Sequence, residues 1–314
     1  MAVRVVFFGN SVSTFTARHF AALLDEPCEL VGVVDVPAAK QNTTNPLAAG
    51  LLNFVDEARK RSIPTYRPTN PNTPGFAAVL AKLKPDLFLT AGYAIILKEE
   101  ILALPDLLAV NFHASLLPDY RGKHPVFWTL RHGEKFGGLT VHVMDPGIDT
   151  GDIIYQVRVR TRREDSVATL YKRIMDRSVD FVEQLIADAE HDRIPRQPQP
   201  ENSGSYFSST TEEDFQLDWT WPAEKIRRFI TITPGKCFAM LGGGKVYFFN
   251  AVKEPGFTTS SPGTLLSIRN TRAAVATGSG ILSSSLIQIE CRGTESFAGF
   301  CRREGFSPGE PLIG

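Results

Sequence analysis

From Val3 to about Asp192 the chain alternates short runs rich in β-branched residues with amphipathic windows, and this alternation limits the possible folds more than any other feature. The runs that predict strands lie at 3–8, 30–35, 87–91, 109–113 and 139–144. The windows that predict helices lie at 15–24, 51–61, 76–83, 125–132 and 167–189. Strands that alternate with helices are typical of βαβ units. We therefore predict an α/β fold built on a Rossmann-like parallel sheet.

The pattern changes after the last of these windows. Residues 193–205 are rich in proline and polar residues, which is typical of a linker. From Tyr206 onward, short apolar runs are separated by Gly, Pro and Ser, as in a small barrel or sandwich. The strands expected there lie at 245–250, 263–268, 273–276 and 286–291, with a helix at 222–230. We predict a first domain over 1–192, a linker over 193–205 and a β-rich domain over 206–314.

The charge balance bears on the kind of partner. With Lys+Arg 34 and Asp+Glu 34 the formal net charge is zero, so binding a polyanion such as nucleic acid would require a local patch. No stretch approaches the roughly 18 uninterrupted apolar residues that cross a membrane, and the apolar N-terminal run is too short for a secretory signal. The four cysteines form no C-x-x-C pair and indicate neither a disulfide framework nor a zinc site. We expect a cytoplasmic protein without a metal ion or membrane partner.

The first cluster with potential chemistry covers residues 111–122 and begins where a predicted strand ends. Open α/β sheets bind their ligands at this end of the strands. Asn111 and His113 are two residues apart on the strand, so their side chains point to the same side. An amide donor beside an imidazole suits acyl chemistry, because the amide stabilises an oxyanion while the imidazole exchanges a proton. A turn-capping Asn and a His bonded to the backbone would have the same spacing.

The second cluster is the glycine-containing acidic loop of residues 144–152, which follows another predicted strand. Asp149 in this loop is placed to reach His113 across the strand ends, to fix its tautomer and to favour its protonated form. The spacing of the acids fits no EF-hand, and an acidic loop that only forms a turn is the alternative. His124, His132 and His142 have no metal-ligand spacing, and we interpret them as solvated or core histidines.

The motif Asn111-x-His113-x-Ser-Leu-Leu-Pro-x-Tyr-Arg-Gly122, followed by Asp149-Thr-Gly-Asp152, resembles the formyltransferases that use 10-formyltetrahydrofolate. The likeness continues through Lys135-Phe-Gly-Gly-Leu-Thr-Val-His142. Beyond the linker it covers segments that look like the C-terminal OB-type barrel of the longer members, at 217–226, 233–235 and 306–310. The resemblance implies a Rossmann-like catalytic domain, an OB-like barrel domain and an enzyme of one-carbon metabolism.

The resemblance also implies roles for individual residues. Asn111, His113 and Asp149 would be the catalytic residues: an acceptor amine attacks the formyl carbon, and Asn111 and His113 stabilise the oxyanion. Asp149 would raise the pKa of the imidazole and help a water molecule to relay the proton. No metal ion is implied.

The folate pocket of the family uses main-chain groups and apolar side chains from two segments. Here the implied donor-binding residues are Leu89, Gly92, Ala94, Ile95, Leu97, Asp145, Gly147 and Ile148. The implied acceptor-binding residues are Ser11, Ser115, Leu116, Leu117, Pro118, Tyr120 and Arg121. In the family the peptide bond that matches Leu117-Pro118 is typically cis.

The acceptor is the open question at this stage. The two-domain layout resembles methionyl-tRNA formyltransferases, but residues 35–46, where those enzymes have a basic insertion, contain only Lys40, and the charges of the second domain nearly balance. Because phosphate neutralisation drives tRNA binding, we expect a small-molecule amine, such as an amino sugar nucleotide or an amino-acid derivative. The alternatives are methionyl-tRNA, hydrolysis of 10-formyltetrahydrofolate to formate, and a non-catalytic folate-binding module. A homodimer is possible.

Overall fold

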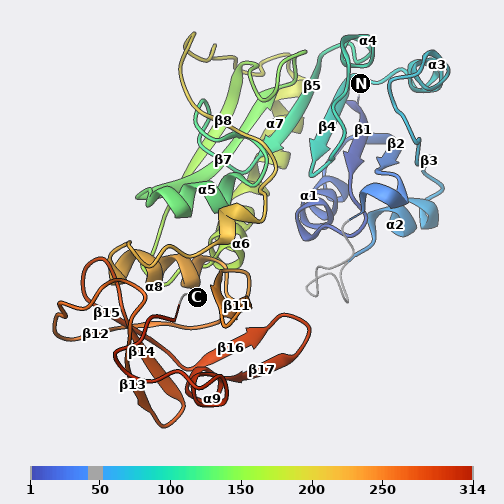
Figure 1. Cartoon of the computed structure of the whole chain (residues 1–314). Helices are drawn as coiled ribbons and strands as arrows, with labels where there is room; N and C mark the ends of the chain where they lie inside the picture. The colour runs from blue at the N-terminus through green and yellow to red at the C-terminus, as the bar shows by residue number, and fades with distance from the viewer. Residues whose placement is uncertain (1, 42–51, 313–314) are drawn as a thin grey trace. The chain divides into compact units, whose positions relative to one another are not determined.

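A computed structural model describes residues 2–41 and 52–312, which form two compact units (Figure 1). The first unit comprises Met1–Thr129, Phe136–Arg160 and Tyr171–Ser208. The second comprises Leu130–Lys135, Thr161–Leu170 and Ser209–Gly314. No helix in the described part of the chain is long and apolar enough to cross a membrane.

A seven-stranded sheet in the order β3-β2-β1-β4-β5-β7-β8 is the centre of the first unit (Figure 1). Its strands are β1 (Arg4–Gly9), β2 (Glu29–Asp35), β3 (Thr65–Tyr66), β4 (Leu87–Ala91), β5 (Leu108–His113), β7 (Phe136–Val143) and β8 (Ile153–Arg160). The first five are parallel, whereas β7 is antiparallel to both β5 and β8. The predicted fold class is confirmed: the sheet is mostly parallel, and only the β7 edge departs from the parallel pattern.

The strand β8 was not predicted. It forms a hairpin with β7, and the loop between them carries Asp149. Buried Tyr155 and Val159 alternate along it with exposed Gln156 and Arg158, a period of two that indicates a strand with one solvated face. A hairpin reverses the chain without a crossover helix, so β8 runs antiparallel to β7.

The helices of this part of the chain are α1 (Thr14–Leu24), α2 (Phe54–Lys60), α3 (Pro74–Lys82), α4 (Glu99–Leu102), α5 (Pro125–His132), α6 (Val167–Ser178) and α7 (Asp180–Glu190). The first residue of the helix predicted at 51–61 lies outside the described residues. The single helix predicted over 167–189 is two helices that meet at Val179. The hydroxyl of buried Ser178 bonds the Met175 carbonyl and His19 at this junction, and such bonding of a serine back to the preceding turn bends helices.

Successive residues of β1 face opposite sides of the sheet. Phe7 packs with Phe20 of α1 and Phe54 of α2 in edge-to-face contacts, with ring centroids 5.2 and 5.7 Å from that of Phe7. Phe8, which points the other way, packs with Phe88 in the cluster on the opposite face. Because both faces are covered, the strands are almost entirely apolar, as in parallel α/β sheets generally.

The second unit contains two four-stranded antiparallel sheets, β10-β11-β16-β17 and β12-β15-β14-β13 (Figure 1). Their strands are β10 (Phe238–Leu241), β11 (Gly244–Phe248), β12 (Val252–Glu254), β13 (Leu265–Arg269), β14 (Arg272–Ala276), β15 (Ile281–Ser284), β16 (Leu286–Ile289) and β17 (Gly293–Ser296). The helices α8 (Ala223–Ile232) and α9 (Phe297–Arg303) complete it. The predicted β-rich C-terminal domain is confirmed, and its sheets are antiparallel; the strands β10, β12, β15 and β17, of three or four residues each, were not predicted.

The aromatic contacts around Phe7 predict the effect of truncating one of them. Phe20→Ala should lower the free energy of unfolding by about 3–5 kcal/mol, because the fully buried ring leaves a cavity among aromatic neighbours. Urea denaturation followed by circular dichroism measures the change. Phe257→Ala, at a side chain 87% exposed, is the matched control and should change stability little. A loss below about 1 kcal/mol for Phe20→Ala would contradict this packing.

Candidate active site

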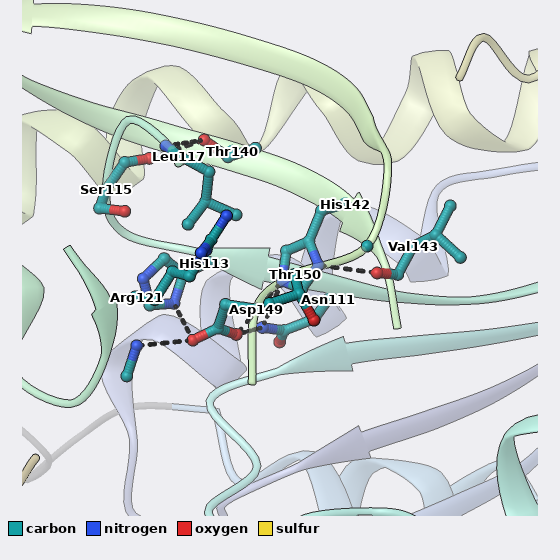
Figure 2. Close-up of polar contacts among 12 residues, drawn as sticks. Asn111, His113, Ser115, Leu117, Arg121, Thr140, His142, Val143, Asp149 and Thr150 are labelled. Atoms are coloured by element: carbon teal, nitrogen blue, oxygen red, sulfur yellow. Dashed lines mark hydrogen bonds and ion pairs between the residues drawn. The ribbon is translucent and has the colours of Figure 1, made fainter. Parts of the chain in front are cut away.

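The structure brings Asn111, His113 and Asp149 together (Figure 2). Asn111 and His113 lie at the carboxyl end of β5, and Asp149 lies in the loop between β7 and β8. The Nδ1 atom of His113 is 3.6 Å from Asp149 Oδ2, and the Nδ2 atom of Asn111 is 3.5 Å from Asp149 Oδ1. An amide, an imidazole and a carboxylate therefore meet at the end of the sheet where α/β folds bind ligands.

The conformation of the 144–152 loop directs Asp149 into this cluster. The Thr150 hydroxyl donates to the Asp145 carboxylate at 2.7 Å, and a Cβ added at Gly147 would be only 1.9 Å from that hydroxyl oxygen. At Gly151 a Cβ would be 2.1 Å from the carbonyl oxygen of Val143. Glycine is thus required at both positions, and the acidic loop does more than reverse the chain.

The Asp149 carboxylate is ionised at neutral pH. Burial raises its pKa, but the hydrogen bond with His142, the nearby His113 and His142 rings, and the backbone N–H of Gly122 outweigh burial and lower the pKa to about 2. The Gly122 N–H donates to Oδ2 at 2.8 Å. Such a carboxylate acts as a fixed negative charge and not as a proton donor.

Asp149 raises the pKa of His113, as predicted, but the net shift of that pKa is downward. Burial lowers the pKa of His113, and this effect exceeds the opposing effects of Asp149 and of the Tyr120 carbonyl. Nε2 lies 2.8 Å from that carbonyl oxygen, which can only accept, so Nε2 carries the proton of the neutral ring. The Nδ1 atom is therefore unprotonated and faces the Asp149 carboxylate.

His142 was assigned to the solvated or core histidines, but the structure places it in the same cluster (Figure 2). It is directly opposite Asn111 in the pairing of β5 with β7. Its Nε2 atom is 3.3 Å from Asp149 Oδ1 and 3.2 Å from Asn111 Nδ2. The sequence signal was the alternation along β7, which faces His142 to the side of Thr140, but the register with β5 was not known from the sequence.

The predicted acceptor residues occupy different environments. Ser115 is fully buried, and its hydroxyl donates to the Asp119 carbonyl, so it supports the loop after β5. Leu117 is also buried, and the Leu117-Pro118 peptide is cis, as predicted. Ser11 is bonded to Asp35 through its N–H and its hydroxyl.

Leu116, Pro118, Tyr120 and Arg121 are half-buried. Tyr120 has a positive φ of 61° and stacks on Phe207, with ring centroids 5.6 Å apart. Arg121 donates to Gln199 Oε1 at 2.8 Å, while its buried Nε has no hydrogen-bond partner within the described structure. The next residue along the chain, Gly122, donates its backbone N–H to the Asp149 carboxylate.

The predicted folate segment follows β4 without regular secondary structure. Leu89 and Leu97 are buried, whereas Gly92 and Ala94 are exposed and Ile95 is half-buried. Across residues 2–41 and 52–312, no hydrogen bond uses the backbone groups of Ala94, Ile95 or Leu97. Open backbone donors and acceptors suit a flat heterocycle with alternating donors and acceptors along one edge, so Ala94 and Ile95 fit a pterin, whereas Leu97 is buried.

The second folate segment lies in the loop that carries Asp149. Asp145 is half-buried and bound to Thr150, whereas Gly147 and Ile148 are exposed. Exposed apolar Ile148 and Ile96 provide surface that a ligand could cover.

Two sequence profiles match the chain. One, described as formyl transferase, covers residues 3–186, and one described as formyl transferase, C-terminal domain, covers residues 210–305. This chain belongs to the formyltransferase family. The family predicted from the motifs is thereby confirmed, and with it an enzyme of formyl transfer.

The chain is similar along its whole length to proteins named methionyl-tRNA formyltransferase. It is 33% identical over 317 aligned residues to that of Pseudomonas entomophila and 32% identical to that of Pseudomonas putida, and each alignment covers 99% of both chains.

Solved structures share the fold at lower identity. An N-formyltransferase from Helicobacter canadensis, solved with folinic acid and dTDP-3-aminofucose, matches with a TM-score of 0.68 at 17% identity, over 91% of this chain and 99% of that one. HypX from Aquifex aeolicus with tetrahydrofolic acid matches with a TM-score of 0.61 at 17% identity, over 97% of this chain and 48% of that one.

The contacts of His113 predict its titration. Its pKa should lie below 6.5, because burial disfavours the imidazolium, and Asp149→Asn should lower it further by removing the charge that favours protonation. NMR titration of the histidine ring resonances measures both values. Asp106→Asn, at an exposed carboxylate, is the matched control and should leave the titration unchanged. An unchanged or higher pKa in Asp149→Asn would contradict the ion pair.

Proposed function

We propose that this enzyme transfers the formyl group of 10-formyltetrahydrofolate to an amine, with Asn111, His113 and Asp149 as its catalytic residues. Membership of the formyltransferase family supports the reaction, and the approach of Asn111 and His113 to the Asp149 carboxylate supports the roles of the three residues. The open backbone groups of Ala94 and Ile95 support the donor. We also propose domains over 1–192 and 206–314 joined by the linker 193–205, since the two profile matches lie on either side of it.

The proposed reaction follows from these contacts. The lone pair of the acceptor nitrogen forms a bond to the formyl carbon, and the electrons of the C=O bond move to oxygen. Asn111 stabilises this oxyanion with its amide N–H. Neutral His113 takes the proton of the attacking nitrogen, directly or through water, and Asp149 stabilises the imidazolium from 3.6 Å. The oxyanion then re-forms the C=O bond as the bond from the formyl carbon to the folate nitrogen breaks, and that nitrogen receives the proton from the His113 imidazolium.

Removal of the oxyanion donor tests this mechanism. Asn111→Ala should lower kcat by on the order of 10²- to 10³-fold, because one preorganised donor is lost from the transition state. The assay follows tetrahydrofolate release with methionyl-tRNA, amino sugar nucleotides, amino acids or no acceptor in parallel. Asn270→Ala, in the turn between β13 and β14, is the matched control and should retain activity. Full activity of Asn111→Ala would contradict the assigned role.

For the acceptor, we propose methionyl-tRNA as the first candidate in place of the small amine expected from charge alone. The support is 33% identity over the whole of both chains with a methionyl-tRNA formyltransferase. Because the formal net charge of the chain is zero, binding of a polyanionic acceptor depends on a local patch of basic side chains.

The second unit contains a hollow that provides such a patch. Its volume is about 140 Å³, smaller than the roughly 300–1,000 Å³ of drug-sized sites and suited to a group the size of phosphate. It is lined by the basic side chains Arg131, His132, Lys225 and Arg228 together with Trp221, Phe229 and Ile232. Lys225 Nζ lies 4.0 Å from the centre of the Trp221 ring. Within the described residues, neither Lys225 nor Arg228 has a carboxylate partner, so both charges are available to an anion.

Neutralising these two charges tests the acceptor. Lys225→Ala with Arg228→Ala should weaken tRNA binding and reduce the slope of log K against log salt by about 2, since each lost phosphate contact reduces it by about 1. Fluorescence anisotropy with labelled methionyl-tRNA at several salt concentrations measures the slope. Lys253→Ala with Arg269→Ala is the matched control, because both side chains are exposed in the same unit and lie outside the hollow. Equal slopes for the two double variants would contradict the proposal.

A small amine is the second candidate acceptor. The balanced charge and the presence of only Lys40 as a basic residue in 35–46 favour it. Turnover with an amino sugar nucleotide or amino acid, and none with methionyl-tRNA, would establish this alternative. Formate release at the full rate without any amine would instead identify a hydrolase.

A further inference from the structure

The Nε2 atom of His142 lies close to two polar groups, of which one requires a hydrogen-bond acceptor and the other a hydrogen-bond donor (Figure 2). The amide Nδ2 of Asn111, at 3.2 Å, carries hydrogen atoms and needs an acceptor. The carboxylate Oδ1 of Asp149, at 3.3 Å, needs a donor. A single ring nitrogen cannot be a donor and an acceptor at the same time.

The other ring nitrogen fixes the tautomer of His142. Nδ1 lies 2.8 Å from the Val143 carbonyl oxygen, which can only accept a hydrogen bond. Nδ1 therefore carries a proton in either charge state, and the charge on the ring depends on whether Nε2 is protonated.

In the neutral state Nε2 has a lone pair. It accepts from the Asn111 amide, whose other hydrogen faces Asp149 Oδ1 at 3.5 Å, so the cluster uses both amide hydrogens. In the protonated state Nε2–H donates to Asp149. Its hydrogen is then repelled by the hydrogens of the Asn111 amide NH2. The amide then turns so that its oxygen faces His142, and its two N–H groups face away from the carboxylate.

We propose that His142 is a positioning residue: its protonated ring binds Asp149 and turns the Asn111 amide so that the N–H groups can donate to the formyl oxygen. This inference rests on the role of Asn111 in the proposed function. His142 acts only through its two neighbours and does not touch the reacting atoms.

Few other charged or titratable groups can affect the protonation of His142 Nε2. Among the described residues, the titratable or charged groups recorded against His142 are Asp149 from the loop and His113 from β5, whose ring centroid is 6.3 Å away. From β8 the paired residue is apolar Ile153. The imidazole is buried, with 3% of its side chain exposed, so its charge is balanced mainly by Asp149.

A double-mutant cycle tests whether His142 acts through Asn111. His142→Phe should lower kcat by no more than the 10²- to 10³-fold expected for Asn111→Ala, with the Kd for 10-formyltetrahydrofolate unchanged. The double variant His142→Phe with Asn111→Ala should be no slower than Asn111→Ala alone, because the two residues form one unit. Multiplicative losses in the double variant would overturn the proposal, as would full kcat in His142→Phe.

A conservative variant separates the charge of His142 from its shape. Glutamine can donate one amide N–H to Asp149 and the other to the Asn111 carbonyl oxygen but does not titrate, so His142→Gln should retain activity and lose the alkaline decline of kcat that follows deprotonation of His142. His191→Gln, at an exposed histidine on the end of α7, is the matched control and should keep the wild-type profile. An unchanged profile in His142→Gln would overturn the proposal.

NMR supplies a readout that needs no acceptor. In wild type the side-chain amide resonances of Asn111 should shift with pH in step with the ring nitrogens of His142, and in His142→Gln they should not. If no tetrahydrofolate is released with any acceptor, the proposed function fails. The coupling between the Asn111 amide resonances and the protonation of His142 can still be measured in that case. Amide resonances that do not respond to the titration of His142 would overturn the inference itself.

Discussion

The candidate site depends on one buried carboxylate. Asp149 accepts a hydrogen bond from the Gly122 N–H at 2.8 Å and lies within 3.6 Å of atoms of Asn111, His113 and His142. These partners come from β5, from β7 and from the short strand β6 (Arg121–Gly122), so a single charge joins three strands. An unpartnered buried carboxylate would be costly, and the cluster is stable because each partner offsets that cost.

The same cluster shows how burial and charge compete. For Asp149 the donors and the neighbouring rings outweigh burial, and its pKa falls to about 2. For His113 burial outweighs the attraction of that carboxylate, and its pKa falls as well. The site at rest therefore combines a fixed negative charge with a neutral base, a combination that stabilises an imidazolium when a proton arrives.

Much of the architecture could be predicted because local pattern determines it. The strand predicted at 87–91 matches β4, and the helix predicted at 125–132 matches α5, since apolar period and flanking residues suffice for such elements. The direction of β7 and the presence of β8 were missed, because the direction of a strand depends on its partners and not on its own residues. The interruption at Val179 was missed for a similar reason: Ser178 bonds His19, which is 159 residues away in sequence.

The sequence by itself determined the family, the α/β class and the three side chains of the motif, because spacing along a strand and within a short loop is local information. Only the tertiary structure decided that His142 faces Asn111 across β5 and β7, that Ser115 is buried in the loop, and that burial lowers the pKa of His113. Only the tertiary structure, too, places Lys225, Arg228 and Arg131 around one hollow, although the formal net charge of the chain is zero. Strand register, desolvation and local electric field arise from residues distant in sequence, so composition and spacing do not reveal them.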